Sequence, residues 1–328
     1  MSQTASSFPL PQSSTSSLEL DDLLFKKNAA DVSRSAIQEF FERTNMQMHN
    51  WASDPTGIVG KRTRDEIRTW TTWDFTAPQY ERAILTSICV ATTMFGHTHI
   101  ETQVHLSLFS LVAGCVDDLE IDPIALESFV ERLYAGLPQL HPVLDLLVDK
   151  LKRMPDYYPS YSATAIFAGT IQFINATLFD KRSHSMPLRP ASLPYIRYKR
   201  ARNSLGEVYG LFAWDKFNFP DVSSHIQILP DARIYLDYAN DILSFYKEEL
   251  EGETNNVIHD RAMVTGKTLS DVLSDLIEES VTSVARARVI LQGEKERHTW
   301  ERFIAGYVAF HFLSPRYRLK ELTGREYI

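Results

Sequence analysis

Residues 240–252 read NDILSFYKEELEG, and three of their side chains are spaced as one stripe along a helix. Asn240, Ser244 and Glu248 follow one another at intervals of four residues, which an α-helix would bring to one face. Each offers an oxygen, from an amide, a hydroxyl or a carboxylate, and hard cations such as Mg²⁺ prefer oxygen ligands. Lys247 would lie about 20° from Asn240 around the helix, close enough to contact a phosphate on the same metal. The alternative is a solvated helix face, but Asn and Ser are weak formers of helix interiors, and here they interrupt an apolar run.

The rest of the chain has the same helical character. Apolar residues at helical spacing predict helices over 97–116, 230–252, 268–291 and 300–313. Convincing runs of strict alternation, the pattern of a half-buried strand, are absent. We therefore predict an all-α fold of about ten helices in a single domain over residues 18–328. Residues 1–17 are rich in Ser, with Pro and little to bury, and are predicted to be a disordered tail.

Composition limits the function further. The 34 basic and 42 acidic side chains give a net charge of −8, which disfavours broad nucleic-acid binding. Only 13 glycines in 328 residues leans towards helices, since strand-rich folds need many tight turns. No stretch reaches the roughly 18 uninterrupted apolar residues of a membrane-spanning helix, and the N-terminus lacks the features of a secretory signal. Cys89 and Cys115 lie in apolar surroundings, which predicts two buried free thiols and a cytoplasmic location.

A second acidic segment, DDLEID at residues 117–122, follows the long apolar helix predicted at 97–116. Carboxylates meeting there would repel one another and resist burial, and a bound divalent metal removes that difficulty. On a continuous helix Asp118 and Asp122 would lie about 40° apart, whereas Glu120 would point to the opposite side. A solvated acidic helix end is the alternative, although negative charge is unfavourable there. The DDxxxD pattern is short and common, so by itself it leaves the choice open.

Together the two segments carry a family resemblance. The string NDILSFYKE resembles the second metal-binding motif of class I terpene synthases, most closely that of the fungal trichodiene synthase family. DDLEIDP is similar to the aspartate-rich motif of that family in its position along the chain, and the Arg-Tyr pair Arg316 and Tyr317 follows in the family's order. The resemblance runs from Asp117 to Leu322, whereas residues 18–116 fit only in helical character. Each motif alone is weakly specific, but their ordered combination is highly specific.

The resemblance implies a class I terpenoid synthase fold, a single helical bundle around a deep apolar active-site cavity, with three Mg²⁺ ions. Asp117 would be the principal carboxylate for two of the ions, with Asp118 supporting it. Asp122 is the weakest metal candidate, because three residues separate it from the aspartate pair. The third ion would be held by Asn240, Ser244 and Glu248.

The resemblance also implies a set of residues that bind the diphosphate of the substrate. Arg200, in the string YKRARNSLGEVYG, matches the arginine that senses the diphosphate. Arg202 is the competing assignment, because the loops between motifs differ in length. Asn203 and Ser204 would occupy the helix break that follows the sensor. The remaining diphosphate contacts would come from Lys247, Arg316 and Tyr317.

The chemistry implied is the ionisation of a prenyl diphosphate, whose allylic cation must then be kept from water in a dry pocket. The chain has 18 Phe, 14 Tyr and 5 Trp, and ring faces can stabilise cations. Only Phe310 is favoured over ordinary core packing, because the family places an aromatic pocket residue there. The histidines His105, His141 and His311 are predicted to be structural. The candidate pocket aromatics that flank the motifs are Phe109, Phe212, Trp214, Tyr307 and Phe310.

The resemblance thus implies a carbon–oxygen lyase acting on phosphates, a sesquiterpene cyclase that converts farnesyl diphosphate into a C15 hydrocarbon or alcohol. Farnesyl diphosphate and a homodimer are suggested by the resemblance alone. A chain-elongating prenyltransferase is the nearest alternative, but it would show two aspartate-rich motifs, and the second motif here is Asn/Ser/Glu. An inactive paralogue that binds diphosphate without turnover is the other alternative, and the intact motif set argues against it.

Overall fold

The computed structural model describes residues 14–46, 51–183, 186–203 and 205–322. These residues form α-helices joined by loops and short 3-10 helices and contain no strand, which confirms the all-α prediction. They make fourteen α-helices, more than the ten or so predicted, because short helices such as α5 and α6 carry too few apolar residues to show a period. The α-helices are α1 Ser14–Thr44, α2 Ile58–Arg68, α3 Glu81–Thr93, α4 Ile100–Asp118, α5 Pro123–Glu127, α6 Phe129–Tyr134, α7 Pro142–Lys152, α8 Ser160–Ser183, α9 Leu193–Asn203, α10 Gly206–Phe212, α11 Leu229–Glu251, α12 Val257–Thr265, α13 Leu269–Ile290 and α14 Glu294–Leu313. The 3-10 helices are η1 Pro78–Tyr80, η2 Met154–Asp156, η3 Val222–Ser224, η4 Ile226–Ile228, η5 Pro315–Tyr317 and η6 Leu319–Glu321.

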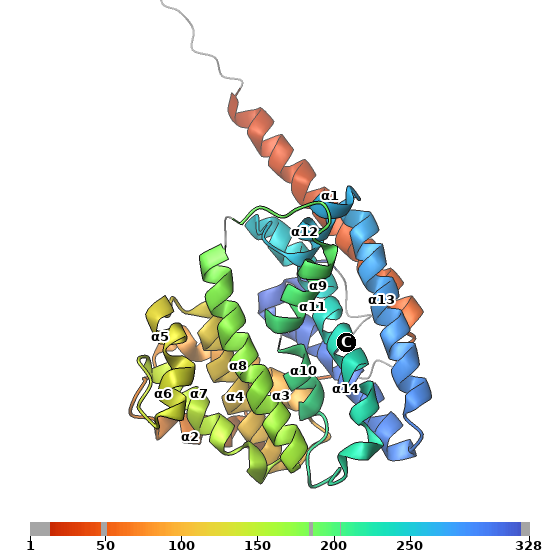
Figure 1. Cartoon of the computed structure of the whole chain (residues 1–328). Coiled ribbons are helices and arrows are strands. Elements are labelled where there is room, and N and C mark those ends of the chain that lie inside the picture. The colour runs from red at the N-terminus through yellow and green to blue at the C-terminus, as the bar shows by residue number, and fades with distance from the viewer. Residues whose placement is uncertain (1–13, 47–50, 184–185, 204, 323–328) are drawn as a thin grey trace, which may run out of the picture.

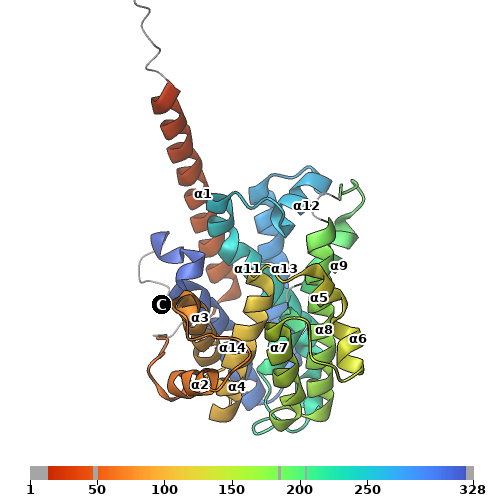
Figure 2. The ribbon, with the colours of Figure 1, turned by 90° about the vertical axis from the view of Figure 1, so that its left-hand side faces the viewer.

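Helix α11, which carries the NDILSFYKE motif, runs through the middle of the bundle (Figure 1). It packs against α1, α9, α10, α13 and α14, and the 3-10 helix η5 also lies against it. Helices α3, α4, α7 and α8 form the other side of the molecule, as the turned view shows (Figure 2). The arrangement gives α11 neighbours from the first and the last helix of the chain, so one helix can present side chains to several distant segments.

The ends of α11 follow the sequence signals at Pro230 and Gly252. Pro230 occupies the first turn, where its missing N–H costs no helical hydrogen bond. Gly252 adopts φ 70°, a conformation that glycine reaches without strain, and its N–H donates to the carbonyls of Glu248 and Glu249. The predicted helix at 230–252 is therefore confirmed to within one residue at each end.

Helix α4, which carries the aspartates, begins and ends at identifiable contacts. The backbone N–H of His99 donates to Asp215 Oδ2 at 2.8 Å, and the His99 imidazole accepts from the N–H of Glu101 at 3.3 Å. The helix therefore begins at Ile100 rather than at residue 97. It ends at Asp118, because Leu119 turns to an extended backbone with ψ 147°. The aspartate pair thus forms the last two residues of a long buried helix.

Helix α1 begins at Ser14, inside the segment 1–17 that we predicted to be a disordered tail. Residues 14–17 are helical, and residues 1–13 lie outside the described residues. The LELDDLL sequence that follows continues the helix, and serine is tolerated in a first turn. The helix therefore begins about one turn earlier than the predicted end of the tail. The N-terminal end of α1 extends beyond the rest of the molecule in both views (Figures 1 and 2).

Both cysteines are free and buried, as predicted. Burial raises the pKa of the Cys89 thiol to about 11 and that of the Cys115 thiol to about 12. The two side chains therefore stay protonated near neutral pH and contribute to the core as small apolar groups.

Among the described helices, α8 alone is long and apolar enough in composition to span a membrane. Its residues Ile166, Phe173 and Ile174 are buried, and α8 packs against α5, α9 and α10. The core helix of a globular bundle meets the same test, so the length and composition of α8 are weak evidence for a membrane span.

Replacing Gly306 with alanine should destabilise the fold where α14 crosses the end of α3. A Cβ at Gly306 would overlap the Thr93 carbonyl group and come within 3.0 Å of Met94 Cα, and backbone atoms cannot move aside cheaply. We expect a loss of about 1–3 kcal/mol in the free energy of unfolding, measured by urea denaturation. Gly114→Ala on α4 is the matched control, because its Cβ would have no atom within 4 Å. That variant should gain up to about 1 kcal/mol from helix propensity, and equal effects of the two substitutions would contradict the close approach at Gly306.

Candidate active site

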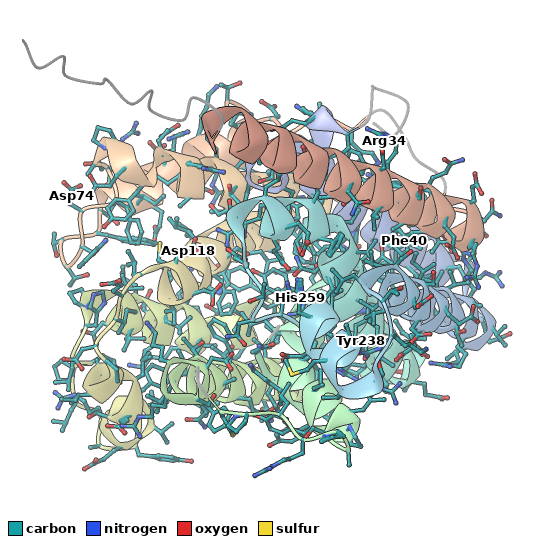
Figure 3. All side chains as sticks on the ribbon, turned by 90° about the horizontal axis from the view of Figure 1, so that it is seen from above. Arg34, Phe40, Asp74, Asp118, Tyr238 and His259 are labelled. Atoms are coloured by element: carbon teal, nitrogen blue, oxygen red, sulfur yellow. The ribbon has the colours of Figure 1, made fainter. Side chains whose placement is uncertain are left out.

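The aspartate motif and the Arg-Tyr pair meet although they lie far apart in sequence. Arg316 on η5 holds Asp118 through contacts of 2.9 Å from Nη1 to Oδ2 and 3.1 Å from Nη2 to Oδ1. Asp118 is labelled in Figure 3, which looks down on this end of the molecule. Both side chains are substantially exposed, so the pair is worth little as a stabilising salt bridge. The contact shows that the C-terminal segment lies beside the end of α4.

Asp117 lies beside the same group of charges. Its side chain reaches solvent, yet the surrounding protein and the neighbouring Asp118 both raise its pKa. Arg316 and Arg200 lower the pKa, and Asp180 at the end of α8 raises it further. These effects on the pKa come from charged groups on other elements, which lie near the end of α4. Asp117 therefore faces a region where α4, α8, α9 and η5 come together.

The stripe on α11 lies near α9 and η5, because Asn240 contacts Arg200, and Asn240 and Glu248 both act on the pKa of Tyr317. Ser244 is buried, and within the described part of the chain its Oγ has no hydrogen-bond partner. Burial raises the pKa of Glu248, and the nearby Ser244 hydroxyl opposes that rise. Glu248 Oε2 accepts from Asn256 Nδ2 at 2.9 Å. A buried hydroxyl beside a desolvated carboxylate suits two ligand positions for one cation.

Arg200 on α9 reaches across to α11. Its guanidinium donates to Asn240 Oδ1 at 3.1 Å and to the Asp237 carbonyl at 2.8 Å, and it pairs with Asp241 at 2.7 Å. Arg202 instead contacts Gln172 on α8. The two candidate arginines therefore lie on different sides of α9, and Arg200 is the one that contacts the α11 motif.

The other residues predicted to contact the diphosphate, or to form the helix break, differ in burial and in their partners. Lys247 pairs with Glu251 at 3.0 Å and with Glu253 at 3.1 Å. Tyr317 is buried, and burial raises its pKa to about 12, so its hydroxyl stays a neutral donor. Asn203 donates to Asp180 at 3.2 Å, whereas Ser204 lies outside the described residues.

Asp122 is separate from the aspartate pair. Because α4 ends at Asp118, the expected 40° separation of Asp118 and Asp122 on one helix face is wrong. Asp122 caps α5 instead, accepting from the N–H of Ile124 at 2.8 Å. Its carboxylate thus has a structural partner, and Glu120 is exposed beside it.

The five candidate pocket aromatics are all buried. Phe109 and Phe212 pack edge to face at 5.1 Å, and Trp214 stacks on His225 at 4.5 Å, as ordinary core residues do. Phe310 differs, because its ring lies 5.5 Å from the ring of Tyr317, a member of the Arg-Tyr pair. Phe310 is therefore the candidate that packs directly against a predicted site residue.

Three residues at this site were not singled out by sequence reasoning as site residues. Asp180 acts on Asp117 and pairs with Lys199 at 3.2 Å, and Asp241 pairs with Arg200. His311, which we predicted to be structural, lies 3.2 Å from the Asn240 amide through its Nε2 atom. Asp241 directly follows Asn240 and could have been noticed there, but the other two contacts depend on tertiary pairing.

A family model, trichodiene synthase (TRI5), matches residues 75–327 of the chain. The chain belongs to the trichodiene synthase family. The match begins before the first motif and therefore includes α3 and all of α4, where the sequence had shown only helical character. Membership in the trichodiene synthase family confirms the resemblance and makes the chain a terpene synthase, an enzyme of the lyase class.

Individual proteins that are similar to this chain are also terpene synthases. Monoterpene synthase 25 of Postia placenta is 38% identical over 298 residues, covering 90% of this chain and 88% of the relative. Terpene synthase 29 of the same organism is 32% identical over 298 residues, covering 90% and 86%. The linalool/nerolidol synthase of Streptomyces clavuligerus superposes with a TM-score of 0.57 at 16% identity, covering 81% of this chain and 98% of that one. That likeness shows the class I terpenoid synthase fold.

Among the described residues, no group of three or more His, Cys, Asp or Glu side chains is placed to hold a metal ion. The candidate oxygens are instead divided between the end of α4 and the stripe on α11, and two of them belong to an amide and a hydroxyl. A metal site built from these residues would need bound diphosphate or water to complete its ligands, as Mg²⁺ sites commonly do.

Proposed function

We propose that this terpene synthase is a Mg²⁺-dependent sesquiterpene cyclase that ionises farnesyl diphosphate and closes the cation into a C15 hydrocarbon or alcohol. The observation that carries the proposal is a pair of contacts between four segments that lie far apart in the sequence. Arg200 contacts Asn240 of the second metal motif, and Arg316 of the Arg-Tyr pair contacts Asp118 of the first. Cationic groups and oxygen ligands gathered from α4, α9, α11 and η5 suit an anionic, metal-bound substrate.

The oxygen donors are suitable for Mg²⁺. Asp117 and Glu248 are carboxylates whose pKa values are raised by burial, so a nearby cation would favour their charged forms. Ser244 is buried beside Glu248, and its Oγ would supply a neutral oxygen ligand to the same cation. When bound, Mg²⁺ would neutralise the charge that develops on the diphosphate as its C–O bond breaks. In the proposal Asp117, with Asp118 in support, and the α11 stripe hold these ions, and Asp122 takes no part.

On substrate binding, the cationic residues would exchange their carboxylate partners for the diphosphate. Arg200, Arg316 and Lys247 each pair with carboxylates of the chain itself: Asp241, Asp118 and Glu251, respectively. A diphosphate arriving between them offers more negative charge than one carboxylate, so the guanidinium groups would turn towards it. The neutral Tyr317 hydroxyl would donate a further hydrogen bond, and Asn203 and Ser204 would form the break after the sensor.

Arg200 is our choice over Arg202 as the diphosphate sensor. It bonds to a proposed metal ligand and acts on Asp117, whereas Arg202 contacts Gln172 and the ring of Tyr198. A sensor must report on the metal-bound diphosphate, and the contact of Arg200 with a proposed metal ligand supports this choice.

The test is incubation of the purified protein with farnesyl diphosphate and Mg²⁺, followed by gas chromatography–mass spectrometry of the extract. We expect a C15 terpene that disappears when EDTA is added. A longer prenyl diphosphate as product would support a chain-elongating prenyltransferase, and binding without product would support an inactive paralogue.

Geranyl diphosphate is a second candidate substrate, because a relative 38% identical to this chain is a monoterpene synthase. A direct competition between the two diphosphates separates the candidates. Preferential C15 product supports our proposal, whereas predominant C10 product would replace farnesyl with geranyl diphosphate while leaving the metal and diphosphate assignments in place.

We further propose that residues 18–328 form one catalytic domain, and that the enzyme is cytoplasmic and homodimeric. Light scattering of the purified protein tests the homodimer, and a monomeric mass at assay concentrations would contradict it.

A further inference from the structure

Asn240 has two different ends, and a metal ligand must present the correct one. Its side-chain amide carries an oxygen that can bind a cation and an NH₂ group that cannot. A half-turn about the last side-chain bond exchanges the two at nearly the same positions. Some contact must therefore select the orientation in which the oxygen faces the metal.

His311 on α14 provides such a contact. Its Nδ1 atom lies 2.8 Å from the Tyr307 carbonyl oxygen, which can only accept a hydrogen bond. Nδ1 therefore carries the proton. The Nε2 atom lies 3.2 Å from Asn240 Nδ2, an amide nitrogen that can only donate, so Nε2 accepts through its lone pair and the ring is neutral. Only the NH₂ end of Asn240 can satisfy that lone pair.

The imidazole ring is itself held in place. His311 is fully buried, and aromatic rings surround it: the centroids of Tyr317, Tyr307 and Phe310 lie at 4.1, 4.5 and 4.9 Å. Rotation of the imidazole would break both the Tyr307 bond and this packing. The direction of the Nε2 lone pair is therefore fixed by α14 rather than by Asn240.

Arg200 and the Tyr317 side chain also contact the Asn240 amide, and the Arg200 contact is of a different kind. Arg200 donates to Asn240 Oδ1 at 3.1 Å, the same atom that a metal ion would need. A cation binding there must displace Arg200, and the arginine then no longer orients the amide. The His311 contact is on the opposite end of the amide and persists through that exchange.

We infer that His311 is a positioning residue that accepts a hydrogen bond from the Asn240 amide and thereby keeps the Asn240 oxygen turned towards the metal. This inference rests on the proposed role of Asn240 as a metal ligand. Residues that orient metal ligands typically contribute ten- to hundredfold to metal affinity or activity.

The first measurement uses the unmodified protein. Nitrogen-15 NMR of the histidine side chains should show His311 as the neutral tautomer with its proton on Nδ1. A His311 ring with the proton on Nε2, or with both nitrogens protonated, would overturn the inference, because no lone pair would then face Asn240. This readout requires neither metal nor turnover.

The second measurement is calorimetric titration of Mg²⁺ into protein with inorganic diphosphate. His311→Leu should weaken binding ten- to hundredfold, and His311→Gln should recover much of the loss, since its amide oxygen can replace the Nε2 acceptor. Tyr235→Phe is the matched control. It removes the 2.8 Å bond from the Tyr235 hydroxyl to the Ile304 carbonyl, which joins the same two helices, α11 and α14. We expect it to lower the melting temperature without changing the affinity.

The outcomes separate this inference from the proposed function. If the wild-type protein does not bind Mg²⁺ in the presence of diphosphate, the proposed function is contradicted. Wild-type binding that His311→Leu leaves unchanged, or a loss that Tyr235→Phe reproduces, would overturn the positioning role alone. If His311→Leu fails to fold, the wild-type tautomer and the affinity of His311→Gln still decide the question.

Discussion

Replacing Asp117 or Asn240 with alanine should abolish turnover of farnesyl diphosphate, by a factor on the order of 10³ or more, while the protein stays folded. Each substitution removes one oxygen donor from the proposed metal sites, and the substrate cannot ionise without cationic stabilisation of its leaving group. The measurement is kcat/KM with farnesyl diphosphate at saturating Mg²⁺, together with thermal unfolding of each variant.

The two variants should differ in stability. Burial and Asp118 raise the pKa of Asp117, so its charged form is unfavourable in the folded protein near neutral pH. Asp117→Ala should therefore unfold at the same temperature as the wild type or slightly higher. Asn240→Ala loses hydrogen bonds to Arg200 and His311, and we expect it to cost about 1–3 kcal/mol.

Asp122→Ala is the control within the same acidic segment. It removes the N-cap of α5 and should cost about 1 kcal/mol of stability with turnover unchanged. Near-normal activity in both Asp117→Ala and Asn240→Ala would show that the metal assignment is wrong. A collapse of activity in Asp122→Ala without unfolding would instead return Asp122 to the ligand set.

The sequence could predict those helices whose ends carry local signals. Pro230 and Gly252 bound α11, and Thr268 opens α13 through a capping box with Asp271. The start of α14 was predicted at residue 300, yet the helix begins at Glu294. Its first turns read EKERH and have no apolar period, because they face solvent and not the core. Periodicity reports burial, so an exposed helical turn gives it no signal.

In the site, too, features within one helix could be predicted from the sequence, whereas contacts between helices could not. The stripe of Asn240, Ser244 and Glu248 follows from helix geometry alone, and the structure keeps all three on α11. The choice between Arg200 and Arg202 stayed open, because it depends on which side of α9 faces α11. The role of His311 could not be predicted at all, because its partner is 71 residues away and the sequence contains no signal for that pairing.

Removing the Arg200 guanidinium, by Arg200→Leu, should cost about 3–5 kcal/mol of stability near neutral pH in addition to turnover. Arg200 and Asp241 are both largely buried, at 13% and 11% exposure of their side chains. Burial raises the pKa of Asp241 to about 6, Arg200 opposes the rise, and Asp237 adds to it. Without the guanidinium, Asp241 must either carry an unpaired charge in the interior or take up a proton, and both cost stability near neutral pH.

The pH dependence follows from the direction of that pKa. A carboxyl whose folded pKa lies above its unfolded value of 3.8 holds its proton longer in the folded state, so stability falls as pH rises between the two. Loss of Arg200 moves the folded pKa of Asp241 higher still. The stability difference between Arg200→Leu and wild type should therefore grow as pH rises above about 6. Urea denaturation at acidic and at mildly alkaline pH measures it, and a difference that is the same at both would contradict the buried pair.

Two further variants separate the structural contribution of Arg200 from its proposed contact with diphosphate. Arg202→Leu should change stability by less than about 1 kcal/mol at either pH, because its partners are neutral groups. The double variant Arg200→Leu/Asp241→Leu removes both charges and should regain most of the lost stability, since an apolar pair can replace a buried ion pair. If Arg200 senses the diphosphate, this stable double variant remains inactive. Recovered turnover in the double variant would mean that Arg200 serves only to neutralise Asp241, and the sensor would have to be sought elsewhere on α9.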